Sequence, residues 1–311
     1  MELKDFRNEK LSLNEVIANE KIESMINEPI PIVDSILETP FGMKIEDGHV
    51  IGLRLNGFGD KILEAPFGEF GELQELILAS NGLKSLPDTL SSLKSLRSLV
   101  IMVNEFDRLP DVVCSMEFLE ELYLDGNLEL TSLPESIGNL TSLQILSLGA
   151  IRLDSLPNSI KNLTSLRTLT LNDGKLTKIP EEVYFLKGLE ELILRWNEIT
   201  ELPEEFGNLK SLRVLDMSNN KLESLPDIFH EMQDLESVYL SNNDLERLPG
   251  SFTSLSSLTT LNLIGNNLNN IDSLKALKAL KTLYLCGNKL TDIPRWLCNL
   301  KWLEILDLSG N

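Results

Sequence analysis

The chain has 311 residues, of which 42% are hydrophobic and 24% are charged, a balance typical of a soluble globular protein. Asp and Glu outnumber Lys and Arg by 48 to 28, so the formal net charge is −20. A field of this sign repels nucleic acids and acidic membrane surfaces, and no apolar run reaches the roughly 18 residues that a membrane span needs. We therefore expect neither a nucleic acid nor a membrane as a partner.

The start of the chain and its cysteines indicate a compartment. The first residues, MELKDFRNEKLSLNEV, alternate charged and polar side chains and lack the apolar core of a secretion signal. The three cysteines are Cys114, Cys286 and Cys298, and an odd number without a signal favours free thiols in a reducing environment. The sequence therefore predicts three free thiols and a cytoplasmic location.

Residues 1–49 differ from the rest of the chain. Ser12 and Glu15 have the spacing of a capping box, which predicts a helix over residues 12–27. The Asp-Gly pair at 47–48 separates two alternating runs, which predicts a β-hairpin. We interpret residues 1–49 as a helix and hairpin cap that covers the exposed leucines of a first repeat. A separate binding role for the helix is the alternative.

From residue 50 onward the sequence repeats with a period of 23 residues, once 24 and once 22. A degenerate first repeat (50–72) is followed by ten complete repeats (73–302) and a partial repeat (303–311). With the first leucine of each repeat as position 1, apolar residues recur at positions 1, 4, 6, 11, 14, 18 and 21. Proline follows position 14 in nine of the ten complete repeats, and position 9 is usually asparagine.

This pattern has a direct physical reading. Positions 3 to 7 alternate like a short strand with one buried face, and strands that return every 23 residues build a parallel sheet. An asparagine among leucines must be hydrogen-bonded if it is buried, and proline suits the start of a turn or short helix. One repeat cannot bury its leucines alone, so the repeats are expected to stack.

The pattern LxxLxLxxNxLxxLPxxhxxLxx resembles the leucine-rich repeat family, and most closely its 23-residue Ras-group class of intracellular and microbial proteins. The resemblance implies an α/β fold: a right-handed horseshoe solenoid with a parallel sheet on its concave face and short helices or turns on its convex face. It also implies that a partner binds on the concave sheet. A small GTPase-like partner is compatible with the resemblance, but the fold hosts many functions.

Two neighbouring repeats interrupt the asparagine column, because position 9 is Ile151 in one and Gly174 in the next. We expect a local change of curvature there.

The sequence offers little for catalysis. Its only two histidines, His49 and His230, lie far apart in any solenoid. No phosphate-binding glycine loop and no metal-spaced group of Cys and His is present. We therefore expect no enzyme, no catalytic residues, no cofactor and no metal.

The binding face is expected where positions 3, 5, 7 and 8 point away from the core. Apart from Arg195, the charged residues in these four columns of the complete repeats and the last partial one are acidic, and Ile, Val and Tyr recur in column 5 without a core role. Column 5 reads Ile77, Val100, Tyr123, Ser147, Thr170, Ile193, Asp216, Tyr239, Asn262, Tyr284 and Asp307. An acidic face with aromatic and aliphatic islands suits a protein or peptide with basic and apolar groups.

The stretch LEELILRWNEITELP (189–203) holds the strongest candidate site. Its Arg195 and Trp196 fall in outward positions, and an exposed tryptophan is typical of a binding hot spot. We expect Asp173 and Asp216 on either side to hold the Arg195 guanidinium. The predicted partner-binding residues are Asp173, Ile193, Arg195, Trp196, Asp216, Tyr239 and Tyr284, with a second, more apolar patch at Ile77, Val100, Met102 and Tyr123. The alternative is that such aromatics only stabilise the sheet.

These observations favour a non-enzymatic scaffold or adaptor that binds a protein or peptide. Two alternatives remain: a sensor region of a longer signalling protein whose enzyme domain lies elsewhere, and an inhibitor that masks a basic enzyme. The last repeat stops at LEILDLSGN, which leaves its leucines without a following coil. We therefore expect either a longer native chain or self-association through this end.

Overall fold

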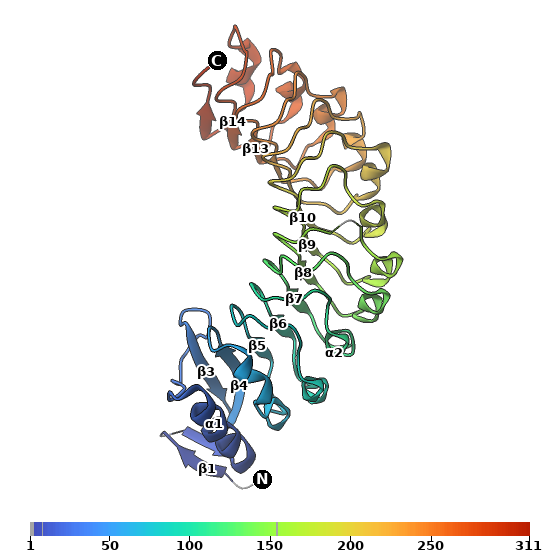
Figure 1. Cartoon of the computed structure of the whole chain (residues 1–311). Helices are drawn as coiled ribbons and strands as arrows, with labels where there is room; N and C mark the ends of the chain where they lie inside the picture. Colours follow the sequence, from blue (N-terminus) through green and yellow to red (C-terminus); the bar gives the residue numbers. More distant parts are fainter. Residues whose placement is uncertain (1–2, 8, 154) are drawn as a thin grey trace. The chain divides into compact units, whose positions relative to one another are not determined.

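A computed structural model describes residues 3–7, 9–153 and 155–311. It divides into two compact units, and each is described by itself. Unit 1 comprises residues 1–151 and 157–165, and unit 2 comprises residues 152–156 and 166–311. Both consist of stacked repeats, each with one short strand and, on the opposite side of the coil, one helical turn (Figure 1).

Unit 1 begins with a hairpin and a helix. The elements are β1 (Leu3–Phe6), β2 (Glu9–Ser12), α1 (Leu13–Ile26), β3 (Phe41–Glu46) and β4 (His49–Leu55). The predicted helix is confirmed: the Ser12 side chain accepts a hydrogen bond from the Glu15 amide, and Asn27 ends the helix in a left-handed conformation. The predicted β3–β4 hairpin is also confirmed, but the β1–β2 hairpin was not expected. The helix packs on the helical turns of the first, degenerate repeat, as a cap would.

Parallel strands follow in chain order in unit 1. The elements are η1 (Asp60–Glu64), η2 (Phe67–Glu69), β5 (Glu75–Ile77), η3 (Asp88–Ser92), β6 (Ser98–Val100), α2 (Asp111–Cys114), β7 (Glu121–Tyr123), η4 (Glu135–Asn139), β8 (Ile145–Ser147) and η5 (Asn158–Asn162), where η marks a 3₁₀ helix. Strands β4 to β8 pair in parallel, each with the next. The strand expected at positions 3 to 7 is present but covers only positions 3 to 5, and a helical turn follows each proline of the repeats as expected.

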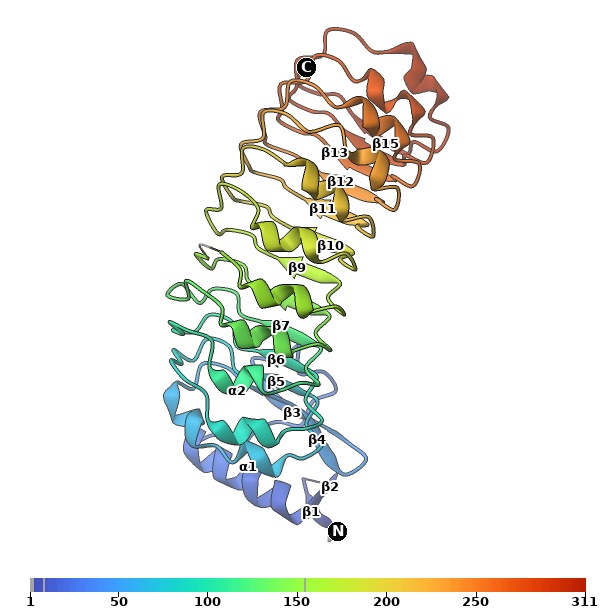
Figure 2. The same cartoon turned by 90° about the vertical axis from the view of Figure 1, so that its right-hand side faces the viewer.

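Unit 2 continues the same pattern. Its elements are β9 (Thr168–Thr170), η6 (Glu181–Phe185), β10 (Glu191–Ile193), η7 (Glu204–Asn208), β11 (Val214–Asp216), η8 (Phe229–Glu231), β12 (Ser237–Tyr239), η9 (Gly250–Ser254), β13 (Thr260–Asn262), η10 (Asp272–Ala276), β14 (Thr282–Tyr284), η11 (Arg295–Asn299) and β15 (Ile305–Asp307). The seven strands pair in parallel, and every pair joins the same position of neighbouring repeats. Figure 2 looks onto the helical turns, which follow one another in a row within each unit.

The leucine positions build the core between the strands and the helical turns. In the repeat from 212, Leu212, Leu215, Met217 and Leu222 are fully buried. Phe229 at position 18 is also buried, and its ring meets Phe252 of the next repeat edge to face. Each apolar position buries one side chain of this kind. The burial of each contributes roughly 1.5–3 kcal/mol to the stability of the stack, before the cost of ordering the chain is subtracted.

The asparagines at position 9 link successive coils by hydrogen bonds. The Asn220 side-chain amide donates to the carbonyls of Leu194 (2.9 Å) and Met217 (3.0 Å), and its Oδ1 accepts from the Ile199 amide (3.0 Å). The same bonds recur at other buried members of the column, among them Asn197, Asn243 and Asn266. In the repeats that carry it, this asparagine therefore satisfies backbone groups where the strand ends.

The boundary between the two units falls at residues 151–166, in the repeats where Ile151 and Gly174 interrupt the asparagine ladder. The change of curvature expected at this boundary stays a prediction. Among the described residues no helix has the length and apolar character that crossing a bilayer requires.

The three cysteines are free, with Cys114 buried and Cys298 exposed, and burial raises the pKa of the Cys114 thiol.

Candidate functional site

The strand register of unit 2 brings the predicted hot-spot residues together. Ile193 on β10, Asp216 on β11 and Tyr239 on β12 occupy the same position of adjacent strands. They therefore lie side by side on the outward face, about 4.8 Å from strand to strand. Arg195 and Trp196 follow β10 at its carboxyl end, and both are exposed, the tryptophan to 58%. We call Asp173, Ile193, Arg195, Trp196, Asp216 and Tyr239 the tryptophan patch.

The predicted clamp on Arg195 is wrong. None of the ion pairs among the described residues includes Arg195. The Asp216 carboxylate instead accepts a hydrogen bond from the Ser218 amide of its own strand end (2.9 Å), as Asp307 does from Ser309. A local bond from a short side chain to the backbone two residues on costs little entropy, and it outcompetes an exposed ion pair with a long arginine.

Asp173 is bonded to a neighbour as well, because its carboxylate accepts from the Asn172 side chain. The Arg195 guanidinium is therefore free of any ion pair within the described part of the chain, and it faces solvent. This leaves a cation next to an exposed indole on the strand face of unit 2, where the other charged residues of the four outward columns are acidic.

Tyr284 lies farther along the same face. The Asn262 position of β13 separates Tyr239 on β12 from Tyr284 on β14, and Asp307 follows on β15. The neighbours of both tyrosines in column 5 are thus polar residues, and each ring is half-buried. Tyr284 extends the face beyond the tryptophan patch and does not join it directly.

The backbone at position 8 was not anticipated from the sequence. Every residue there has a positive φ: Ser80, Val103, Gly126, Ala150, Asp173, Trp196, Asn219, Asn242, Gly265, Gly287 and Gly310. Glycine, asparagine and aspartate tolerate this left-handed conformation, but a β-branched or bulky side chain is an outlier in it. Val103 (φ 53°) and Trp196 (φ 58°) are such outliers, and both are more than half exposed. Strain at an exposed apolar residue points to a binding role.

This strain predicts a stability change at Val103. Replacing Val103 by Asn, the residue that the equivalent positions 219 and 242 carry, is expected to raise the free energy of unfolding by about 1 kcal/mol, because the left-handed backbone is relieved. Urea unfolding followed by circular dichroism measures it. Val214→Asn in strand β11 is the matched control and is expected to destabilise, because asparagine is a poor strand former. A loss of stability in Val103→Asn contradicts the strain argument.

The second predicted patch lines a hollow in unit 1. Ile77, Val100 and Tyr123 occupy the same position of β5, β6 and β7, and Met102 follows β6. The hollow has a volume of about 310 Å³. We call it the strand-face hollow; its lining is Leu37, Arg54, Asn56, Glu75, Ile77, Ala79, Ser98, Val100, Met102, Glu121 and Tyr123.

The expectation that Ile77 is exposed is wrong, because only 3% of the residue is accessible. The segment after α1 accounts for this. The Arg54 guanidinium on β4 donates to the carbonyls of Ile36 and Leu37 (both 3.0 Å), which holds this segment over the first strands. Ile77 therefore forms the floor of the hollow, while Val100, Met102 and Tyr123 are half-buried around it.

Two carboxylates give the hollow its charge. Glu121 accepts hydrogen bonds from the Ser98 hydroxyl (2.9 Å) and from Tyr123 (3.5 Å). Burial, and then the charge of Glu121, raises the pKa of the Glu75 carboxyl. Burial raises the pKa of Tyr123 to about 12, with the Glu121 charge as the next cause. The hollow thus combines an apolar floor with negative charge that is partly shielded from water.

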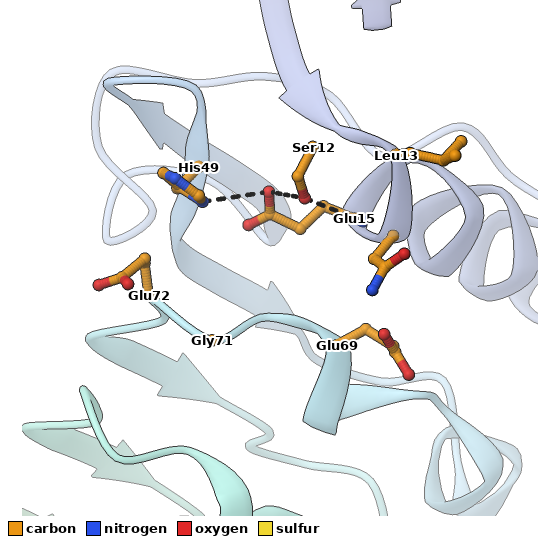
Figure 3. Close-up of a pocket in the computed structure, with 8 residues that line it drawn as sticks. Ser12, Leu13, Glu15, His49, Glu69, Gly71 and Glu72 are labelled. Carbon is orange, nitrogen blue, oxygen red and sulfur yellow. Dashed lines mark hydrogen bonds and ion pairs between the residues drawn. The ribbon is translucent and has the colours of Figure 1, made fainter. Parts of the chain in front are cut away.

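A further cluster of polar residues lies at the cap, where the sequence predicted only the capping box of Ser12 and Glu15 (Figure 3). The buried Glu15 carboxylate accepts from the Ser12 hydroxyl (2.6 Å) and the Val50 amide (3.0 Å), and it lies 3.3 Å from His49 Nδ1. Ser12, Glu15 and His49 line a hollow of about 410 Å³ together with Glu69 and Glu72. Glu15 and Val50 are 35 residues apart, so no local sequence signal could have revealed the contact.

The order of these groups does not suit nucleophilic catalysis. A serine nucleophile needs a histidine as its base, whereas here the carboxylate stands between Ser12 and His49. The cluster instead joins α1 to β4, which is a structural role. Within residues 3–7, 9–153 and 155–311, no group of three or more His, Cys, Asp or Glu side chains is placed to hold a metal ion.

The repeat geometry agrees with comparisons to known proteins. A model described as a leucine-rich repeat region matches residues 192–311, and a single leucine-rich repeat model matches residues 118–140. A leucine-rich repeat protein of Leptospira interrogans is 35% identical, with a TM-score of 0.73; the match covers 84% of this chain and 72% of that one. The chain belongs to the leucine-rich repeat family. The matched models describe repeats and not enzymes.

Other leucine-rich repeat structures are similar over less of their own length. The plant peptide hormone receptor RGFR1, solved in complex with RGF2, is 25% identical with a TM-score of 0.59; the match covers 88% of this chain and 56% of the receptor. TLR13, in the TLR13–ssRNA13 complex, is 24% identical with a TM-score of 0.69. The match covers 83% of this chain and 40% of the TLR13 chain, and it shows the fold alone. No curated protein is similar enough in sequence to count as a relative.

Proposed function

We propose that this leucine-rich repeat chain is a non-enzymatic protein-interaction module that binds a partner protein or peptide on its strand face. The observation that carries the proposal is Trp196, a bulky aromatic that is 58% exposed and held in a left-handed backbone position. Packing does not explain it, because an indole exposed to this degree contributes little to the core. Exposed, rigidly held tryptophans are characteristic of binding hot spots.

The charge of the strand face in each unit supports a partner of particular chemistry. In unit 1, Glu75 and Glu121 lie on this face with apolar Val100 and Met102 between them. In unit 2, Asp173 and Asp216 lie on it with Ile193 between them. A protein or peptide with basic and apolar groups complements this surface, and the charge of −20 speeds its approach. The relative TLR13 was solved with ssRNA13, but here a nucleic acid would meet carboxylates of its own sign.

Several finer assignments belong to the same proposal. The 23-residue LPxxhxxL pattern supports the Ras-group, intracellular class, with a scaffold or adaptor role in signalling and a small GTPase-like partner. The three free cysteines support a cytoplasmic location. A sensor region of a longer signalling protein is compatible with the same surface, and so is an inhibitor of a basic enzyme. The inhibitor alternative predicts a complex that weakens strongly as salt rises.

The proposal is tested by affinity capture from a lysate of the source organism. The wild-type chain and Trp196→Ala serve as parallel baits, and Phe185→Ala is the control, since Phe185 is an exposed aromatic (61%) on a helical turn. We expect a protein that the wild type and Phe185→Ala capture and Trp196→Ala captures poorly. Equal capture by all three baits contradicts a strand-face site in unit 2.

Self-association through the last repeat is the remaining expectation. Strand β15 pairs only with β14 within the described residues, and Trp302, Ile305 and Leu306 are exposed beside it. An open strand edge with apolar side chains favours pairing with a second copy. We expect the mass from light scattering to rise toward that of a dimer as concentration increases, and Leu306→Lys to abolish the rise. A constant monomer mass contradicts this expectation.

A further inference from the structure

We propose that the strand-face hollow of unit 1 binds a partner segment in which a lysine or arginine stands next to an aliphatic or aromatic side chain. This inference rests on the proposed function and adds the chemistry of the segment and its place on the molecule. It is carried by three features of the hollow: an apolar floor, two carboxylates without an ion-pair partner, and a neighbouring surface of the same character.

The floor provides for the apolar side chain. Ile77 is buried at the bottom of the hollow, and the side chains of Val100, Met102 and Leu37 line the hollow around it. A hollow of about 310 Å³ is at the lower end of the range for ligand sites, so it accommodates one or two side chains rather than a large ligand. Entry of an apolar group removes these side chains and the ligand from water together, which favours binding.

The two carboxylates provide for the cation. Glu75 on β5, Ser98 on β6 and Glu121 on β7 are partners in register, so the carboxylate-bearing residues lie two strand spacings, or about 10 Å, apart. Neither glutamate belongs to an ion pair within the described part of the chain. A lysine ammonium or arginine guanidinium beside the hollow reaches one of them or bridges toward both.

The cations already present do not fill this role. The Arg54 guanidinium donates its hydrogen bonds to the Ile36 and Leu37 carbonyls. Lys44 on β3 and Arg54 lower the pKa of Glu75 from a distance, but burial and the Glu121 charge outweigh them, and the pKa stays raised. The Glu75 carboxylate is therefore less stable in the free protein than in water, and a ligand cation relieves that cost.

A neighbouring surface favours a peptide over an isolated amine. Met102 lines the strand-face hollow, and the next residue, Val103, lines a larger hollow of about 770 Å³ at the strand ends. That hollow is lined by exposed Leu128 and by Glu105, Asp107 and Glu129, and its one lysine, Lys84, lies 3.4 Å from Glu105. Acidic and apolar character thus continues along the surface, where a chain with several side chains makes contacts that a single amine cannot.

The test selects ligands without assuming a sequence. A library of random heptapeptides is selected on the wild-type chain, and enriched peptides are titrated against variants. We expect enrichment of Lys or Arg beside Leu, Ile, Phe or Trp. Affinity for these peptides is expected to fall at least tenfold in the double variant Glu75→Gln, Glu121→Gln. The control double variant Glu223→Gln, Glu246→Gln removes the same charge from exposed sites in unit 2 and is expected to change affinity less than twofold.

Two further measurements separate a binding role from a folding role. At neutral pH Glu75→Gln is expected to raise the melting temperature, because the raised pKa means that the charged form destabilises the folded chain; this gain disappears as the pH falls below the ordinary glutamate range. Val100→Thr keeps the shape of the wall but makes it polar, and it is expected to weaken the same peptides. If a variant loses affinity for the peptides while its melting temperature is not lowered, the substitution acts on binding and not on folding.

The outcomes distinguish this inference from the proposed function. Enriched peptides that need Trp196 but ignore Glu75 and Glu121 leave the proposed function standing and overturn the inference. Peptides without basic residues, or with equal affinity for both double variants, overturn it as well. If no peptide is enriched on the wild type, the inference falls, while capture of a protein dependent on Trp196 still tests the proposed function.

Discussion

Trp196→Ala is expected to weaken partner binding by at least about 2 kcal/mol, roughly thirtyfold, while leaving the fold intact. The indole is 58% exposed, so its loss is expected to change the free energy of unfolding by no more than about 0.5 kcal/mol. Alanine is tolerated in the left-handed conformation of this slot, since Ala150 occupies it in another repeat. Titration of the captured partner and a urea unfolding curve measure the two effects.

Phe185→Ala is the control for this experiment, because it removes an aromatic of similar exposure from the opposite side of a repeat in the same unit. It is expected to leave both binding and stability nearly unchanged. A strong loss of stability in Trp196→Ala with unchanged binding would show that the indole is a packing element and that the tryptophan patch is not the site.

The largest expected effect on stability is at the asparagine ladder. Asn220→Ala is expected to lower the free energy of unfolding by about 2–4 kcal/mol. The substitution leaves the Ile199 amide and the Leu194 and Met217 carbonyls without the partners that the side chain supplies, and these groups lie in the buried turn. A buried polar group that loses its partner costs about 1–3 kcal/mol.

Asn208→Ala provides the comparison, since Asn208 is exposed at the end of η7 and is not part of the ladder. Its expected cost is within about 0.5 kcal/mol. Urea unfolding of both variants, followed by circular dichroism, gives the difference. Similar costs for the two asparagines would mean that water replaces the ladder bonds and that the column is not a stabilising device.

The periodic part of this molecule is predictable from its sequence. Strands, helical turns and the buried asparagine column each depend on residues that recur within 23 positions, so the pattern itself encodes them. The capping box at Ser12 and the Asp-Gly turn at 47–48 are local signals, and both predicted elements are present.

The features that could not be predicted depend on contacts without a period. Ile77 lies in a hollow lined by Arg54 and by Leu37, whose carbonyl Arg54 binds, and Leu37 lies outside the repeats. Glu15 reaches Val50 across 35 residues. The left-handed backbone at position 8 had a signal, because Gly and Asn recur there. Against that background the Val103 and Trp196 side chains are exceptions: Val103 lines the hollow at the strand ends of unit 1, and Trp196 lies in the tryptophan patch.

The central claim is that a partner binds on the strand face of this leucine-rich repeat chain. Site-specific photo-crosslinking tests it most directly, with a benzophenone amino acid placed at Tyr239 in the tryptophan patch or at Phe185 on a helical turn. Both positions carry aromatic residues in the native chain, so neither change is expected to disturb folding. We expect the captured partner to be crosslinked from position 239 and not from 185. Crosslinking from position 185 alone would place the partner on the helical turns and contradict the account.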